Sequence, residues 1–136
     1  MHDIAAISRE ILEGAWSGGR FDERIYASDY VFVGPLVPDG VRGADGERQL
    51  IAGYRRAFPD LTFTIEEQLA DGGRVASRWT ATGTHEGDFG ELAPTGRRAT
   101  VGGVSIARFT GARIGSVWTM WDVHGLLAQL GASPAR

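Results

Sequence analysis

Cysteine and lysine are both absent from this chain of 136 residues. Without cysteine there is no disulfide bond, no thiolate metal site and no thiol nucleophile, and this composition fits a reducing compartment. We therefore expect a cytoplasmic protein. All 14 basic residues are arginines, and they are scattered rather than clustered, so the sequence offers no phosphate-binding patch.

Excess charge of one sign and long apolar runs are also lacking. The formal net charge is -3 at pH 7, which gives no electrostatic reason to expect a nucleic acid or an anionic membrane as a partner. Charged residues interrupt the apolar residues of segment 2–16, so it resembles neither a signal peptide nor a membrane span. Three dispersed histidines form no ligand set, so we expect no metal. The length suits a single domain over residues 1–136.

The first part of the chain has the patterns of helices. Apolar residues recur at three- and four-residue spacing after Asp3, which predicts an amphipathic helix that ends at Gly18. Asp22 is placed to cap a short second helix, with Phe21 in the position of a hydrophobic staple. The segments expected next are a strand or extended arm over 30–33, a loop over 38–46 and a third helix over 46–57.

The second part has the patterns of strands. Its β-branched and aromatic residues predict four long strands, over 61–70, 74–85, 97–109 and 113–122, before a short C-terminal helix. Helices followed by an antiparallel sheet give an α+β fold. Glycines within these strands either permit bending or relieve packing. We expect a cone-shaped α+β barrel, with the N-terminal helices packed against a curved antiparallel sheet around one apolar pocket.

Asp122 stands at the junction between the last strand and the last helix. Because side chains alternate along a strand, it shares a face with Trp118 and Met120, which would give it an apolar surround. Such a surround disfavours the charged form and makes a carboxylate a better base. The alternative is a helix cap, a common use of Asp. Trp121 alternates to the other face, where an apolar exterior would favour packing against a second subunit.

His85 is a second candidate for proton transfer, because an imidazole can act as acid and base near neutral pH. It ends the row of side chains that contains Trp79, although a histidine at the end of a strand is often structural. Trp79 and Tyr54 could stack on a flat ring, but a small core also buries such aromatic residues. The residues alone leave these alternatives open.

Three segments, in order, resemble one family. They are AFPDL (57–61), GTHEGDFGELAPTGRR (83–98) and DVHGLLAQLG (122–131). Together they resemble the SnoaL-like polyketide cyclases over nearly the whole chain. The resemblance implies a cone-shaped barrel of the nuclear transport factor two type, with an apolar interior cavity.

The resemblance also implies a role for Asp122. In the cyclases, the Asp before the ending G-x-L-x-Q-L-G transfers protons during an intramolecular aldol closure of an aromatic polyketide ring. Two polar positions differ, since Ser105 stands where the cyclases have His and Phe32 where they have Asn. These differences favour the branch of the family implicated in hydroxylation. There, a carboxylate would deprotonate an electron-rich substrate, which itself reacts with dioxygen without a metal or flavin.

The expected function is a tailoring step on an aromatic polyketide-like small molecule, with hydroxylation preferred. Aldol cyclisation and non-catalytic binding of a hydrophobic ligand are the alternatives. We expect no cofactor, a homodimer formed through the sheet, and a separate reductase where the substrate starts as a quinone. The candidate catalytic residues are Asp122 and His85. The candidate substrate-binding residues are Trp118, Met120, Trp79, Ser105, Phe32 and Tyr54.

Overall fold

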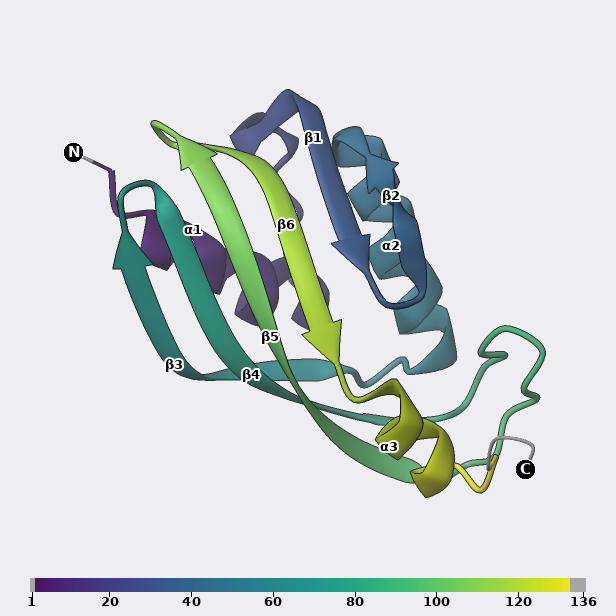
Figure 1. Ribbon diagram of the computed structural model, residues 1–136. Coiled ribbons are helices and arrows are strands. Elements are labelled where there is room, and N and C mark those ends of the chain that lie inside the picture. The colour runs from purple at the N-terminus through teal and green to yellow at the C-terminus, as the bar shows by residue number, and fades with distance from the viewer. Residues whose placement is uncertain (1, 133–136) are drawn as a thin grey trace.

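A computed structural model describes residues 2–132, in which helices lie against one curved sheet (Figure 1). The α-helices are α1 (Ile4–Arg9), α2 (Gly43–Ala57) and α3 (Val123–Gln129). The strands are β1 (Tyr26–Gly34), β2 (Val37–Arg42), β3 (Thr62–Asp71), β4 (Arg74–Thr84), β5 (Arg98–Thr110) and β6 (Arg113–Trp121). The predicted α+β class and the short C-terminal helix are confirmed.

The N-terminal helix changes its geometry along its length. A π-helical turn over Glu10–Gly14 and a 3-10 turn over Ala15–Ser17 follow α1. Asp3 caps α1 by accepting a hydrogen bond from the Ala6 N–H at 3.0 Å. The segment ends at Gly18, whose φ of 95° lies in the left-handed region that glycine adopts without strain. The predicted start and end of this helical segment are confirmed.

A short 3-10 helix, Glu23–Ile25, leads into β1. Asp22 caps it by accepting a hydrogen bond from the Arg24 N–H at 3.1 Å. Phe21, just before the cap, stacks on Tyr26 just after the helix, with ring centroids 5.1 Å apart. This contact is the predicted hydrophobic staple, and it fixes the direction in which the chain enters the sheet.

The segment after β1 differs from the loop expected over 38–46. A turn at Pro35 and Leu36 leads into β2, which pairs with β1 in antiparallel fashion, and α2 follows directly. Pro38 lies within β2, which forms one edge of the sheet. An edge strand tolerates a proline because the missing N–H need not pair with a neighbour. The proline and glycine of this segment therefore belong to a strand rather than to a loop.

The sheet has six strands in the order β2-β1-β6-β5-β4-β3. All neighbours are antiparallel except β1 and β6, which run parallel, so the sheet is mixed rather than antiparallel throughout. The parallel pair arises because the chain leaves β2 through α2 and returns by the β3 to β6 meander. That route brings the last strand beside the first one.

A bulge in β6 decides which of its side chains face the helices. Arg108 of β5 pairs with Ser116, and the next residue, Phe109, pairs with Ile114, so Gly115 is an extra residue in β6. One extra residue shifts the alternation of side chains by one position. The faces of β6 after Gly115 are therefore opposite to those expected from strict alternation.

This shift corrects the expectation for the end of β6. Trp118 and Met120 are 46% and 50% exposed and lie on the outer face of the sheet. Thr119 and Trp121 lie on the inner face, where they line a cavity. The placement of Trp118 and Met120 in the cavity, and of Trp121 outside, was wrong because a count from Ile114 does not include the bulge.

Buried apolar side chains form two clusters between the helices and the sheet. One contains Trp16 and Ile114, and the other contains Phe58, Trp79 and Leu126. Members of both clusters line the same cavity. The core is therefore built around a hollow that the curvature of the sheet leaves open.

Candidate active site

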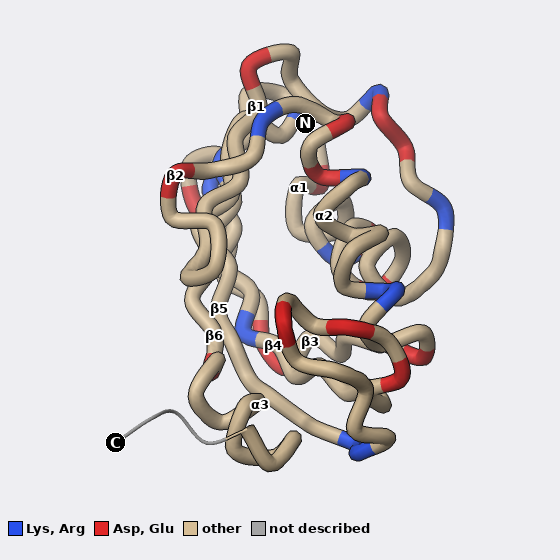
Figure 2. Tube along the Cα trace, turned by 90° about the vertical axis from the view of Figure 1, so that its right-hand side faces the viewer, with Lys and Arg blue, Asp and Glu red and all other residues tan. Residues whose placement is uncertain are grey.

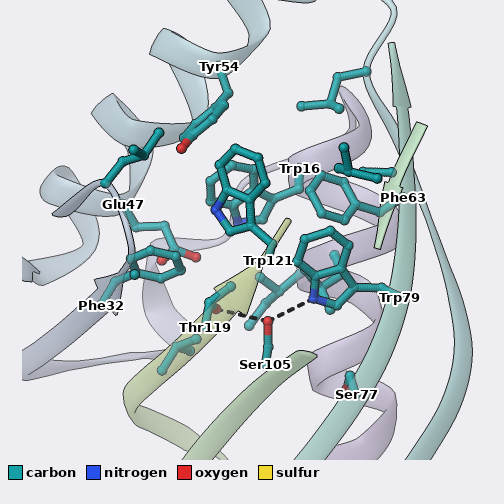
Figure 3. A pocket seen from close by; sticks show the side chains of 18 of the residues that line it. Trp16, Phe32, Glu47, Tyr54, Phe63, Ser77, Trp79, Ser105, Thr119 and Trp121 are labelled. Carbon is teal, nitrogen blue, oxygen red and sulfur yellow. Dashed lines mark hydrogen bonds between the residues drawn. The ribbon is translucent and has the colours of Figure 1, made fainter. Parts of the chain in front are cut away.

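The cavity lies between the helices and the concave face of the sheet, and its wall is mostly apolar (Figure 3). Its aromatic residues come from helices and strands alike. They are Trp16, Phe32, Tyr54, Phe58, Phe63, Trp79 and Trp121. Flat aromatic faces around an apolar space suit a rigid, flat ligand.

Four of the predicted substrate-binding residues line this cavity, namely Phe32, Tyr54, Trp79 and Ser105. They reach it from β1, α2, β4 and β5, so the fold brings together residues far apart in the sequence. Burial raises the pKa of the Tyr54 hydroxyl to about 12, so this group keeps its proton at neutral pH. Tyr54 can therefore donate a hydrogen bond to a ligand.

Gly103 makes the position of Trp79 possible. The two residues pair across β4 and β5, and a Cβ at Gly103 would collide with the indole ring of Trp79 and lie 2.8 Å from Cβ of Trp121. Lying close to β5, the indole donates a hydrogen bond from its Nε1 to Ser105 Oγ at 3.0 Å. A glycine in the strand thus permits a polar contact inside an apolar wall.

Ser105 belongs to a row of three hydroxyl groups on the inner face of the sheet. Ser77 pairs with Ser105 across β4 and β5, and Ser105 pairs with Thr119 across β5 and β6. The oxygens of Ser105 and Thr119 are hydrogen-bonded at 2.9 Å (Figure 3). We term Ser77, Ser105 and Thr119 the hydroxyl row. Sequence reasoning missed Thr119 as a site residue because the Gly115 bulge hides its direction.

Glu47 places a carboxyl group in the wall of the cavity, and the residue is only 1% exposed. Its two oxygens accept hydrogen bonds from the hydroxyls of Tyr26, at 2.8 Å, and Tyr30, at 2.5 Å. Burial raises the pKa of Glu47, outweighing the opposite effect of the hydrogen bonds. Burial also raises the pKa of both tyrosines, so their hydroxyls remain donors. Among the described residues that line the cavity, Glu47 is the single carboxylate.

Sequence reasoning missed Glu47, although the sequence contains a signal for it. The residue lies among charged and small neighbours at the start of α2, which resembles an exposed first turn. It is, however, four residues before Ile51 and seven before Tyr54, and this spacing puts all three on one helical face. Extending the buried face of α2 by one turn would have placed a carboxylate opposite the sheet.

Asp122 is exposed and caps α3, accepting a hydrogen bond from the Gly125 N–H through its Oδ1 at 2.8 Å. Of the two placements considered, the structure shows the cap. Trp121 and Leu126, on either side of Asp122 in the chain, both line the cavity, whereas Asp122 itself is not part of its wall. No hydrogen bond of Oδ2 is found within residues 2–132.

His85 is fully buried, but it is not part of the cavity wall. Its Nδ1 accepts a hydrogen bond from the Thr95 N–H at 3.2 Å, and its backbone carbonyl accepts one from the Gly96 N–H at 2.8 Å. The ring packs against Phe58, with centroids 5.4 Å apart. These contacts hold together the two ends of the loop over 86–96. The geometry therefore gives His85 a structural role and no contact with a ligand in the cavity.

Charged groups lie mainly outside the cavity, and Figure 2 shows acidic and basic residues interspersed along the trace. Arg78, Arg108 and Arg113 are exposed. No group of three or more acidic or histidine side chains that could hold a metal ion is found in the part of the chain that the structure describes. None of the described helices is long and apolar enough to span a bilayer.

Comparison with known proteins agrees with this architecture. The chain is similar to AclR of Streptomyces galilaeus, described as a proposed hydroxylase, with 30% identity and a TM-score of 0.77 over 98% of this chain and 86% of AclR. It is also similar to IdmH of Streptomyces antibioticus, described as a proposed polyketide cyclase, with 29% identity and a TM-score of 0.82 over 96% of this chain and 99% of IdmH.

A SnoaL-like protein of Jannaschia sp. CCS1 has the same fold, with a TM-score of 0.86 at 15% identity over 98% of each chain. None of the curated protein sequences matches. The family model described as SnoaL-like polyketide cyclase matches residues 6–130. With nearly its whole length matched, this chain belongs to the SnoaL-like polyketide cyclase family.

Proposed function

We propose that this protein is a tailoring enzyme of aromatic polyketide biosynthesis that binds a flat polycyclic substrate in the cavity. The observation that carries the proposal is the wall, which combines aromatic rings with a few polar groups at fixed positions. Burial and stacking favour a rigid aromatic ligand, and the polar groups orient it. Membership of the SnoaL-like family supports the substrate class.

The reaction we prefer is hydroxylation. A substrate in its hydroquinone form loses a proton and passes electrons directly to dioxygen. One oxygen atom replaces a ring hydrogen as a hydroxyl group, and the other leaves as water while the hydroquinone becomes a quinone. A separate reductase supplies the hydroquinone where the substrate starts as a quinone. The likeness to AclR and the presence of Ser105 and Phe32 at the two altered polar positions support this preference.

In this proposal Asp122 takes the proton at the end of the cavity beside α3. The family position supports this role, as do the two neighbours of Asp122 that line the cavity, Trp121 and Leu126. The hydrogen bond from Gly125 fixes the orientation of the carboxylate through Oδ1. Because Asp122 is exposed, it can act only on an edge of the ring system that extends out of the cavity.

Glu47 is the competing carboxyl group for proton transfer. Its raised pKa favours the protonated form relative to an exposed acid, so it is suited to donate a proton rather than to accept one. Once the proton has left, the hydroxyls of Tyr26 and Tyr30 stabilise the carboxylate. We therefore assign Asp122 as the base and keep Glu47 as the acid to test beside it.

Aldol cyclisation is the second candidate reaction, and the likeness to IdmH favours it. It uses the same proton transfer, because a base must form the enolate that attacks a carbonyl within the same molecule. The two reactions differ in their mass balance. Cyclisation with dehydration loses water, whereas hydroxylation gains one oxygen atom from dioxygen.

The test is turnover of a chemically reduced hydroxyanthraquinone under labelled dioxygen, followed by mass spectrometry and corrected for oxidation without enzyme. We expect the product to contain one labelled oxygen. Asp122→Asn should lower the rate by about 100-fold or more, which is typical for loss of a general base, whereas the exposed control Asp71→Asn should not.

Other outcomes separate the alternatives. Loss of water without label indicates cyclisation. Undiminished turnover in Asp122→Asn combined with inactive Glu47→Gln transfers the catalytic role to Glu47. Tight binding of the ring compound by the wild-type protein, without any turnover of hydroquinone or linear polyketide substrates, indicates a binding module.

A further inference from the structure

The hydroxyl row contains O–H groups for which residues 2–132 supply no acceptor. Ser105 Oγ accepts the hydrogen bond from Trp79 Nε1, and the oxygens of Ser105 and Thr119 share one hydrogen bond. Each hydroxyl carries one proton, so that shared bond uses one of the two protons. Whichever residue donates, the other keeps an O–H without a partner among the described residues.

Ser77, at the other end of the row, also has an O–H without an acceptor among the described residues. Its oxygen accepts a hydrogen bond from Gln68 Nε2 at 3.2 Å, which leaves its own proton unused within residues 2–132. Ser8, on α1, lines the same cavity, and its buried Oγ has no hydrogen-bond partner in the described part of the chain. The polar groups of this cavity are thus only partly satisfied by the residues that the structure describes.

The side chains next to the row on the inner face of its own strands offer it no other acceptor. The side chains two positions away on the same strands are apolar, aromatic or absent, and those on the cavity wall include Val75, Ala107 and Val117. A buried hydroxyl proton without a partner is unfavourable. Ser105 and Ser77 serve as acceptors for Trp79 and Gln68, but that use does not account for the O–H protons left over in the row. The row is therefore poorly explained by packing alone.

The direction of the hydrogen bonds indicates what the row binds. Trp79 and Gln68 both donate into it, and a hydroxyl that already accepts a hydrogen bond becomes a stronger donor through its own proton. The groups of the row that lack a partner among the described residues are therefore O–H donors. Their complement is an oxygen atom with lone pairs.

We infer that the hydroxyl row binds an oxygen atom attached to the edge of the polycyclic ring, which is a hydroxyl oxygen in the hydroquinone substrate and a carbonyl oxygen in the quinone product. The inference rests on the proposed function and specifies how the ring is oriented in the cavity. As the ring loses its proton, negative charge spreads to this oxygen and the hydrogen bond from Ser105 or Thr119 strengthens. The row is thus a positioning element that also stabilises the anion.

The test compares two probes that differ only in their carbonyl groups, anthraquinone sulfonate and anthracene sulfonate, by calorimetric titration. We expect the wild-type protein to bind the quinone more tightly, by about three- to tenfold. The double variant Ser105→Ala, Thr119→Val removes both O–H donors and should lose this preference when it is compared with the native pair in a Trp79→Phe background, where the indole N–H freed from Ser105 cannot replace them. Thr80→Val makes the same change on β4 at a residue outside the cavity wall and should keep it.

The outcomes distinguish this inference from the proposed function. A preference for the quinone that persists in the double variant overturns the role of the hydroxyl row and leaves the polycyclic substrate standing. Equal binding of both probes by the wild-type protein likewise overturns the role of the hydroxyl row and leaves the polycyclic substrate standing. Absence of binding by either probe to the folded wild-type protein contradicts both the row and the proposed substrate class.

Discussion

Glu47 is held between two tyrosine hydroxyls in a wall from which water is largely excluded. An acid whose pKa is higher in the folded than in the unfolded chain binds its proton more tightly when the chain is folded. The stability that Glu47 contributes is therefore fully present below its unfolded value, near 4.5, and is lost as the pH rises through the raised folded pKa.

This linkage predicts a pH-dependent effect of Glu47→Gln, which is neutral at every pH. The free energy of unfolding of the wild-type protein should decrease, relative to that of the variant, as the pH rises from about 4.5 through the raised pKa. Urea unfolding over a series of pH values measures this difference. A difference that stays constant across the series contradicts the buried, proton-retaining carboxyl group.

Gly103 provides a second prediction for a single residue. Gly103→Ala should lower the free energy of unfolding by about 1 to 3 kcal/mol, because the new Cβ has no room beside Trp79 and Trp121. Gly102→Ala is the matched control, since a Cβ there lies 3.7 Å from its nearest neighbour, the Trp79 carbonyl oxygen. Equal losses in the two variants, measured by urea unfolding, would show that close packing at Gly103 is not the cause.

Among the secondary-structure elements, α3 depends on Asp122, which makes the roles of cap and base separable. Asn is as good a cap as Asp, whereas Ala is a poor one. Asp122→Asn should therefore keep the stability of the wild type while losing turnover, and Asp122→Ala should lose about 1 kcal/mol as well. Thermal unfolding and the rate assay, run on both variants, check this. Full activity in Asp122→Asn would show that Asp122 serves as a helix cap and not as the base.

The sequence predicts most of the elements because their causes are local. The caps at Asp3 and Asp22, the staple at Phe21 and the four long strands follow from neighbouring residues. Edge strand β2 escaped prediction because a proline and a glycine are typical of loops, and only pairing with β1 overrides that preference.

The site was harder to predict because it depends on the register of β6 against β5 and on how far the buried face of α2 extends toward its first turn. The spacing of side chains and the resemblance to the SnoaL-like family placed four residues in the cavity, and the structure puts them there. They are Phe32, Tyr54, Trp79 and Ser105. Thr119 was missed through the bulge. Neither the bulge nor its effect on the following residues can be seen in β6 alone, because a bulge is defined by what the partner strand pairs with.

At the scale of the whole molecule, the outer face of the sheet has an apolar patch of four exposed residues on β5 and β6. Val104 pairs with Met120 and Ile106 pairs with Trp118, so the four side chains are contiguous. We propose that a second copy of the chain covers this patch, because a contiguous apolar surface is typical of subunit contacts.

The prediction for this surface concerns the oligomeric state. The wild-type protein should sediment as a dimer, and Trp118→Arg should convert it to a monomer by placing a charge within the apolar contact. Leu69→Arg is the control, since Leu69 is exposed on β3, at the far edge of the sheet. A monomeric wild-type protein in sedimentation equilibrium contradicts the patch as a subunit interface.

The extra residue at Gly115 has a consequence for how this scaffold can diverge. Deleting it would turn the rest of β6 over, so that Thr119 and Trp121 exchange sides with Trp118 and Met120. One deletion would thus change the side chains of the cavity wall and of the outer face at the same time. Separate substitutions would need several steps to make the same change. As long as Gly115 is kept, single substitutions can change the cavity wall or the outer face of β6 separately.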